Sequence, residues 1–396
     1  MNFFFSFLSN VSRMLIGFVA VVILSKYLTV SEFGISTWWL LIATIFGVFF
    51  DFGYTVYLSK EVKENNFDHL SKSLSVKFRL IIVCVIIILS MLLYKQEPLY
   101  PVLLISAFGF NSLCSSFVVI LRVNNKFDVE SILVFFNNLF ILIIMLFCLE
   151  FDFGLYALPV SYFIAKLCYL SYFMFEYRNL INLNWRYFGF VQELKRVSPF
   201  FLHAFFGYLY LNVDGAMMPL YVSPQDVGYY QAASKLFFGM LLFSEIISSV
   251  LLPRISKIGL SKAISNGYIS KYNVLIISLS LLSVMIVFFC KEIIVVNFFS
   301  PEYTDSIQYF ELLLIVVLLR YIGLIYGLVI TLSGYQSFRT ISTLITLVIM
   351  VILCFILMPI YGVVGGISAL ILSHVIINVF YIVFCYCKFK RIFILC

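Results

Sequence analysis

Twelve long apolar stretches follow one another through nearly the whole of this 396-residue chain. About 20 apolar residues in a row are enough to cross a bilayer as a helix. In lipid, a helix also satisfies its own backbone hydrogen bonds. The pattern therefore predicts an all-α, polytopic membrane protein. Composition agrees, because 63% of the residues are hydrophobic and only 11% are charged, whereas soluble domains average about 25% charged residues.

The apolar stretches fall into two sets of six. We expect the first six helices at about 3–27, 37–58, 78–94, 101–121, 132–149 and 155–175. We expect the second six at about 199–221, 229–252, 272–290, 308–332, 340–358 and 365–386. The first stretch has no basic leader and no small-residue cleavage site, so it reads as a retained helix and not as a signal peptide.

Basic residues gather in alternate connections, which sets the predicted orientation. The opposite connections contain only Lys95 and Lys291. By the positive-inside rule, we expect both termini to be cytoplasmic. The net charge of +7 is then mainly a topology signal, and we expect no nucleic-acid partner. The basic side is marked by Lys60, Lys63, Lys72, Lys77, Arg79, Arg122, Lys126, Arg178, Arg186, Lys195, Arg196, Arg254, Lys257, Lys262, Lys271, Arg339, Lys388, Lys390 and Arg391.

Three short motifs recur in the same order in the two halves of the chain. They pair Ser31-Glu32-Phe33-Gly34 with Gln225-Asp226-Val227-Gly228, Leu121–Phe127 with Leu332–Phe338, and Phe153-Gly154-Leu155 with Tyr361-Gly362-Val363. We expect two pseudo-symmetric six-helix lobes, at 1–177 and 199–396, joined by a cytoplasmic linker at 178–198. Such halves recur in transporters with a midplane site. The alternative is that similar turn chemistry simply recurs in short loops.

Four charges lie well inside apolar stretches: Arg13, Lys166, Asp214 and Arg320. A charge in hydrocarbon costs about 2.5–3.5 kcal/mol on insertion scales, so unpaired charges are expected to face a wet cavity. Three of the four are cations. A cavity at membrane depth with cationic walls indicates a path for an anionic molecule.

Further motifs are spread over the full length. They are Leu28-Thr29-Val30-Ser31-Glu32-Phe33-Gly34, Phe50-Asp51-Phe52-Gly53, Ser198-Pro199-Phe200, Asn212-Val213-Asp214, Asp226-Val227-Gly228-Tyr229-Tyr230 and Ala232-Ala233-Ser234-Lys235. With them the chain resembles the polysaccharide transporters of the MOP flippase superfamily, and most closely the O-antigen (Wzx-type) flippases. The motifs are moderately specific for the superfamily and do not name a substrate.

The resemblance implies a MATE-like fold with two six-helix lobes and alternating access. It also implies export of an oligosaccharide linked to a polyprenyl pyrophosphate, with membrane lipid as surroundings. A polymerase and a chain-length regulator of the same pathway are the implied protein partners. No catalytic residue and no cofactor are expected, while coupling to H⁺ or Na⁺ is open.

The candidate substrate-binding residues are the three cations with nearby tyrosines. Arg13 could bind a pyrophosphate in bidentate fashion, or it could extend to the headgroups. Lys166 shares a helix face with Tyr162 and Tyr169, which suits a sugar or a headgroup. Arg320 lies too deep in its stretch for easy extension to either surface. It is followed by a G-x-x-x-G pattern that more often marks helix packing.

The candidate coupling or gating residues are mostly acidic. In the stretch 199–221, His203, Gly207, Tyr210 and Asp214 are spaced to share one face of a helix. We expect His203 and Asp214 to serve coupling and Tyr210 to contact substrate, against the alternative of a helix that merely lines a wet cleft.

Three further polar residues are weighed in the same way. Asp51 and Glu245 lie toward the cytoplasmic ends of their stretches. They are interpreted as gate residues, or equally as plain interface carboxylates. His374 has no polar companion within a turn and is interpreted as a satisfied buried histidine.

Two other functions compete with the flippase. One is a multidrug exporter of the same superfamily, in which membrane carboxylates capture cations. The other is a membrane-embedded O-antigen polymerase, which needs a larger external loop than the connection at 291–307. The sequence has no Walker motif, no H-E-x-x-H and no G-x-S-x-G. The nine cysteines lack a paired spacing, so no metal site is expected.

Overall fold

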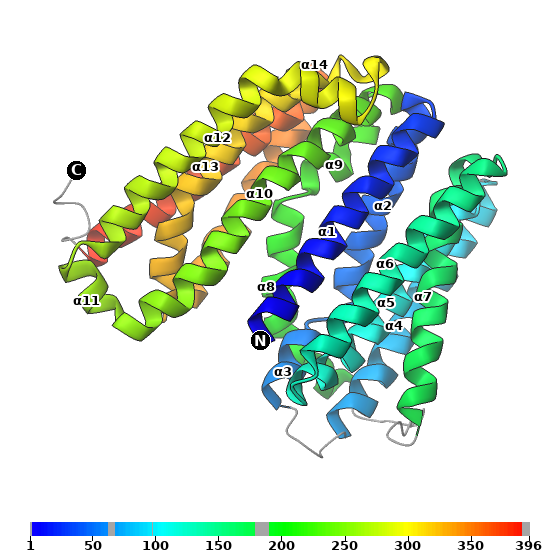
Figure 1. Cartoon of the computed structure of the whole chain (residues 1–396), viewed down its shortest axis with the longest axis horizontal. Helices are drawn as coiled ribbons and strands as arrows, with labels where there is room; N and C mark the ends of the chain where they lie inside the picture. Colours follow the sequence, from blue (N-terminus) through cyan, green and yellow to red (C-terminus); the bar gives the residue numbers. More distant parts are fainter. Residues whose placement is uncertain (1, 62–67, 97, 179–189, 390–396) are drawn as a thin grey trace. The chain divides into compact units, whose positions relative to one another are not determined.

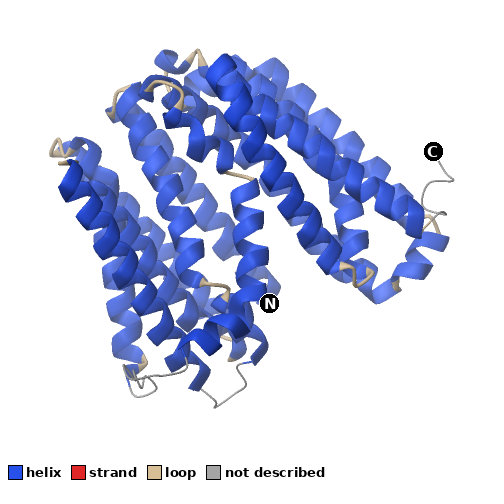
Figure 2. Cartoon of the chain, turned by 180° about the vertical axis from the view of Figure 1, so that it is seen from behind, coloured by secondary structure: helices blue, strands red, loops and turns tan. Residues whose placement is uncertain are grey.

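The computed structural model describes residues 2–61, 68–96, 98–178 and 190–389. Within these ranges helices are joined by turns and short loops, and no strand occurs (Figure 2). The all-α prediction is confirmed. The chain divides into two compact units, Met1–Tyr208 and Leu209–Cys396. This division assigns residues 199–208, the first part of the predicted seventh span, to the first unit.

The first unit is a bundle of long helices. In Figure 1, α1 runs along α6, while α5 packs against α2, α4 and α7. Its helices are α1 (Asn2–Tyr27), α2 (Val30–Asp51), α3 (Tyr54–Glu61), α4 (Asp68–Lys95), α5 (Tyr100–Val123), α6 (Phe127–Glu150), α7 (Ala157–Glu176) and most of α8 (Phe190–Tyr210), with a 3₁₀ turn at Gly154–Tyr156.

In the second unit, α13 is the central helix. It packs against α10, α12 and α14, and α14 also contacts α9. The helices are α9 (Val213–Met217), α10 (Pro224–Ile258), α11 (Leu260–Ser265), α12 (Tyr268–Phe298), α13 (Ser306–Leu332) and α14 (Gln336–Lys388), with 3₁₀ turns at Met218–Leu220 and Pro301–Tyr303.

Nine helical segments in the described part are long and apolar enough to cross a membrane. One of them, α14, is two helices in sequence, because Gly362 inside it has non-helical backbone angles. This break falls between the predicted spans 340–358 and 365–386. Helices α1 and α8 also lie where spans were predicted, although they are not among the nine. The chain is a multi-pass membrane protein.

The repeated acidic turn caps a helix in each unit. The backbone N–H of Glu32 donates to Oγ1 of Thr29 over 3.3 Å at the start of α2. The N–H of Asp226 likewise donates to Oγ of Ser223 over 3.2 Å at the start of α10. Each carboxylate also accepts a hydrogen bond from its capping hydroxyl. The motif recurs because N-terminal N–H groups need such acceptors.

The second repeat ends a helix in each unit, in the same Schellman geometry. After α5 the N–H of Lys126 donates to the Leu121 carbonyl over 2.8 Å, and Asn125 has φ 56°. After α13 the N–H of Tyr335 donates to the Ile330 carbonyl over 3.2 Å, and Gly334 has φ 80°. In this geometry Asn125 corresponds to Gly334. The sequence comparison pairs Asn125 with Gln336, so the structural register differs from it by two residues.

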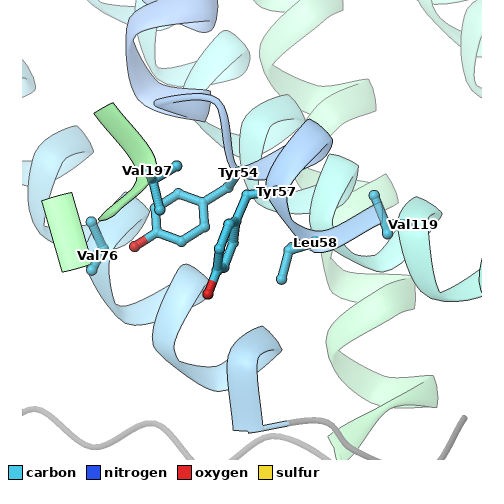
Figure 3. Packing of buried hydrophobic residues seen from close by; sticks show 6 residues of the cluster. All are labelled: Tyr54, Tyr57, Leu58, Val76, Val119 and Val197. Atoms are coloured by element: carbon cyan, nitrogen blue, oxygen red, sulfur yellow. The ribbon is translucent and has the colours of Figure 1, made fainter. Parts of the chain in front are cut away.

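A sharp bend ends α2 and makes room for a buried cluster. Phe52 has φ 46° and Gly53 has φ 74°. A Cβ on Gly53 would lie 2.5 Å from the backbone nitrogen of Phe201 in α8, so a side chain there is excluded. The predicted span 37–58 is therefore two helices, α2 and α3. The core beside the bend is shown in Figure 3 and contains Tyr54, Tyr57, Leu58, Val76, Val119 and Val197.

Candidate functional site

Arg13, Lys166 and Arg320 have no salt-bridge partner among the residues that the structure describes. Other cations of the chain do: Lys77, Arg122, Arg196 and Lys291 each pair with a carboxylate. The three residues chosen from the sequence as anion ligands are thus positive charges that no carboxylate in the described ranges neutralises.

Lys166 lies inside the first unit, on α7. Its side chain is only 9% exposed, and its Nζ lies 5.7 Å from the centre of the Tyr169 ring. The hydroxyl of Tyr169 is also buried and has no hydrogen-bond partner in the described part of the chain. The lysine side chain and the tyrosine hydroxyl, one turn apart, are two donors for which the described residues supply no acceptor, so water or a ligand must supply one.

Arg13 of α1 lies within electrostatic range of Lys166 and Tyr169. As a whole residue it is exposed on the first unit. It also interacts electrostatically with Arg122. Two like charges that act on each other favour an anion in their vicinity.

A paired arginine borders this region. Arg122 at the end of α5 donates from Nη2 to Oε1 of Glu130 over 2.6 Å and from Nε to both carboxylate oxygens. Glu130 on α6 is 1% exposed. This carboxylate lies within electrostatic range of Arg13 and Tyr169. The pair was missed in the sequence, where Arg122 counted only as a topology signal.

Tyr162 sits one turn before Lys166 on α7. Its ring stacks on Phe108 of α5, with centroids 5.8 Å apart and an interplanar angle of 13°. The side chain is partly exposed. Of the two tyrosines predicted to flank Lys166, Tyr169 lies beside its ammonium, while the ring of Tyr162 packs on α5.

Asp51, a predicted gating residue, forms a salt bridge with Lys77 inside the first unit. Its Oδ1 accepts from Nζ of Lys77 over 2.8 Å and from Oγ1 of Thr55 over 2.6 Å. The Lys77 ammonium is fully buried and also donates to the Ser112 carbonyl and to the hydroxyls of Ser115 and Ser116. Lys77 lies inside α4 and not in a connection, contrary to its use as a loop charge above.

Arg320 occupies the middle of α13 in the second unit and is partly exposed. It acts electrostatically on Tyr210 and His374, two buried side chains of the same unit. The rings of Tyr210 and His374 lie 5.0 Å apart. Tyr210 and Arg320, both predicted to contact substrate, are therefore neighbours.

The predicted polar stripe on 199–221 is interrupted. Helix α8 ends at Tyr210, and α9 begins at Val213 after a turn in which Asn212 has φ −137° and ψ −2°. The 3.6-residue spacing does not continue across such a turn, so Asp214 does not extend the face that carries Gly207 and Tyr210. A backbone break at membrane depth is tolerated where it is enclosed by protein or lines a cavity.

Asp214 itself is completely buried. One carboxylate oxygen accepts a hydrogen bond from the hydroxyl of Tyr230 on α10, and the other oxygen has no side-chain partner among the described residues. The Tyr230 contact was missed, although Tyr230 lies in a motif quoted above. The side chains of His203 and Glu245, the remaining coupling candidates, lie outside the described part of the structure.

Comparison with known proteins gives the family. The model of the family "Polysaccharide biosynthesis protein" matches residues 1–259, well over half of the chain. The chain belongs to this family. No curated protein sequence matches it.

Solved structures show the same fold for this member of the polysaccharide biosynthesis protein family. The lipid II flippase MurJ in an inward closed conformation is similar with a TM-score of 0.78 at 17% identity, over 96% of this chain and 87% of that one. An inward-facing multidrug resistance MATE family transporter of the MOP superfamily has a TM-score of 0.67 at 13% identity, over 96% and 95%. The MATE transporter VcmN of Vibrio cholerae, in its bent form, has a TM-score of 0.57 at 14% identity, over 98% and 95%. The predicted MOP fold is confirmed.

Proposed function

We propose that the chain is a flippase that moves polyprenyl-pyrophosphate-linked O-antigen, or a similar polysaccharide repeat unit, from the cytoplasmic to the external leaflet of a bacterial inner membrane. The main support for this proposal is that Lys166 has no carboxylate partner in the described part of the chain. A buried ammonium without a carboxylate is a site for an anion. The family's role in polysaccharide biosynthesis makes a lipid-linked sugar phosphate the natural anion.

The residues of the first unit divide the work of binding. Arg13 can form two parallel hydrogen bonds to phosphate oxygens, because its guanidinium is planar and its donors form a fork. Lys166 acts as a point charge that needs no fixed direction. Tyr162 and Tyr169 offer flat faces and hydroxyls for the first sugar. The polyprenyl chain stays in lipid, where its methylene groups are most stable.

Arg320 and Tyr210 give the second unit its own binding group. Alternating access requires that a ligand stabilise different states of the transporter to different degrees. In the proposal the anion is held more tightly in one of these states than in the other, so its presence biases the transition between the inward-open and outward-open states. His203, Asp214 and Glu245 are the proposed coupling or gating residues, with H⁺ or Na⁺ as the coupling ion. Asp51, predicted for the same role, pairs with Lys77 and is assigned to packing instead. The polymerase and the chain-length regulator act next on the product.

One observation favours a second candidate. Asp214 is buried with an oxygen that no side chain of the described part satisfies, as expected of a carboxylate that captures a cation. A cation-coupled multidrug exporter of the same fold is therefore the alternative. The three unpaired cations weigh against it, because they would repel a cationic drug.

The test uses cells that lack this gene but retain the polymerase and the ligase. We expect no surface glycan, not even a single repeat unit on its acceptor, together with lipid-linked units on the cytoplasmic leaflet. Wild-type chain should restore the glycan, Lys166→Gln should not, and Arg196→Gln, at an exposed cation, should. A repeat unit that still reaches the surface in the deletion strain contradicts the proposal.

A further inference from the structure

His374 lies on the face of α14 that packs against α13 close to Arg320. One turn after His374, Nδ2 of Asn378 donates to the carbonyl of Leu319 over 2.8 Å. A Cβ on Gly323 would lie 2.2 Å from Oδ1 of the same asparagine, so the two helices meet closely there. Residues four apart on a helix share a face. His374 therefore points toward the stretch of α13 that carries Arg320.

The hydrogen bonds of His374 fix which nitrogen holds the proton. Nδ1 lies 3.0 Å from the carbonyl oxygen of Leu370. A carbonyl only accepts, so Nδ1 is the donor and carries the hydrogen. Nε2 is then a bare lone pair. It is buried, the residue is 1% exposed, and Nε2 has no hydrogen-bond partner among the described residues. The sequence-based interpretation of His374 as a satisfied core histidine does not hold for this nitrogen.

The surroundings of His374 contain one cation that acts on it. Arg320 on α13 lies within electrostatic range of the imidazole, and two like charges repel each other. Tyr210, from the end of α8, lies against the ring, and Tyr381 of α14 acts on Tyr210. Asp214 of α9, a carboxylate in an element packed against α14, accepts a hydrogen bond from Tyr230 of α10. A proton on Nε2 would place two positive charges beside each other.

We infer that His374 and Arg320 form a coupled site in which an anion held by Arg320 is accompanied by a proton on Nε2 of His374. The anion neutralises the charge that opposes protonation, and the protonated ring adds a second donor and a second charge for the anion. The two ligands thus bind cooperatively, and the coupling is reciprocal. The proton comes from water and no covalent bond changes. The inference rests on the proposed function in taking a phosphate group of the carrier as the natural anion.

Sulfate tests the site without the natural substrate. It remains a dianion between pH 5.5 and 8, so any pH dependence of its binding belongs to the protein. We would measure sulfate affinity and proton uptake on the purified full-length chain in detergent. We expect tighter binding at pH 5.5 than at pH 8, by roughly 5- to 150-fold, with proton uptake on binding. Equal wild-type affinity at the two pH values overturns the inference whatever the variants do.

Three variants assign the effect. The variants are compared in a Lys166→Gln background, so that the lysine of the first unit takes no part in the proton uptake. In this background His374→Gln should remove the proton uptake and the pH dependence. His69→Gln, at one of the chain's two other histidines, should retain both. Arg320→Gln should also remove the proton uptake, and it decides the question if His374→Gln does not fold. Uptake that persists in either His374→Gln or Arg320→Gln contradicts the coupled site. The two proposals can fail separately. If the deletion strain still exports glycan and the purified chain nevertheless shows the coupled site, the proposed cargo is wrong and the site stands.

Discussion

Two buried lysines of the first unit, Lys77 and Lys166, have opposite surroundings. The ammonium of Lys77 donates to a carboxylate, a carbonyl and two serine hydroxyls, all within 3.1 Å. The ammonium of Lys166 has a tyrosine ring at 5.7 Å and no acceptor among the described residues. Both side chains are at least nine-tenths buried, so burial alone does not tell a structural charge from a binding charge.

The difference lies in whether the protein supplies the acceptors. A lysine has three N–H donors, and Lys77 uses them on α2 and α5, beside the bend at Phe52 and Gly53. Its role is to fix how α2, α4 and α5 pack. Lys166 has no acceptor among the described residues, so its ammonium is free to bind an anion in the proposed complex. The comparison predicts that the two lysines respond oppositely to removal of charge.

The largest effect on folding is expected from Lys77→Met. It leaves Asp51 without its cation, and breaking a buried pair costs about 3–5 kcal/mol in other proteins. The Asp51 side chain is 22% exposed, so water can solvate it in part and we expect a loss at the low end of that range. We expect a large fall in the yield of monodisperse protein and in its melting temperature in detergent. The double variant Lys77→Met/Asp51→Leu removes both charges and should recover most of the loss. A single variant as stable as the wild type would mean that the pair is not structural.

A smaller effect is expected from Glu130→Gln. The change weakens three hydrogen bonds to Arg122, and a hydrogen bond to a charged group contributes about 1.5–3 kcal/mol. Arg122 is 39% exposed and can be hydrated in its place, so we expect a loss at the low end of that range.

The same variant should bind anions more tightly. Glu130 lies within electrostatic range of Arg13, and removing its negative charge leaves the region more positive. Sulfate affinity, measured beside the melting temperature, should therefore rise while stability falls. If sulfate affinity and melting temperature both fell, Glu130 would not belong to the anion site.

The smallest effect on folding is expected from Lys166→Met. No acceptor is lost, and a buried unpaired charge is replaced by an apolar side chain of similar length, so the melting temperature should stay the same or rise. Surface glycan should nevertheless be absent in cells that carry only this variant. A variant that folds poorly and still exports glycan would reverse the roles of the two lysines.

The positions of the helices could be predicted from the sequence, because hydropathy over about 20 residues is a local property. The break near Gly362 was predicted for the same reason, since it separates two apolar stretches. The break at 211–212 and the bend at Phe52 lie within apolar stretches and escaped prediction. Hydropathy does not report backbone angles.

The candidate site was predicted only in part. Lys166 stood out because it lies in the middle of an apolar stretch, and its lack of a carboxylate partner agrees with that choice. Lys77 lies at the edge of a stretch and was therefore assigned to a loop. Its partner Asp51 is 26 residues away in the sequence, and only the packing of α2, α4 and α5 brings the two together. The free nitrogen of His374 likewise depends on the packing of α14 against α13.

The most direct measurement is the binding of polyprenyl pyrophosphate to the purified wild-type chain and to Lys166→Gln, followed by native mass spectrometry in detergent. Uncharged polyprenol serves as the control ligand. A hydrogen bond to a charged group contributes about 1.5–3 kcal/mol, and about 1.4 kcal/mol corresponds to tenfold in affinity. We expect the variant to bind the pyrophosphate about tenfold more weakly or worse, with polyprenol binding unchanged. Equal affinity of the two proteins for polyprenyl pyrophosphate would contradict the assignment of Lys166 as an anion ligand.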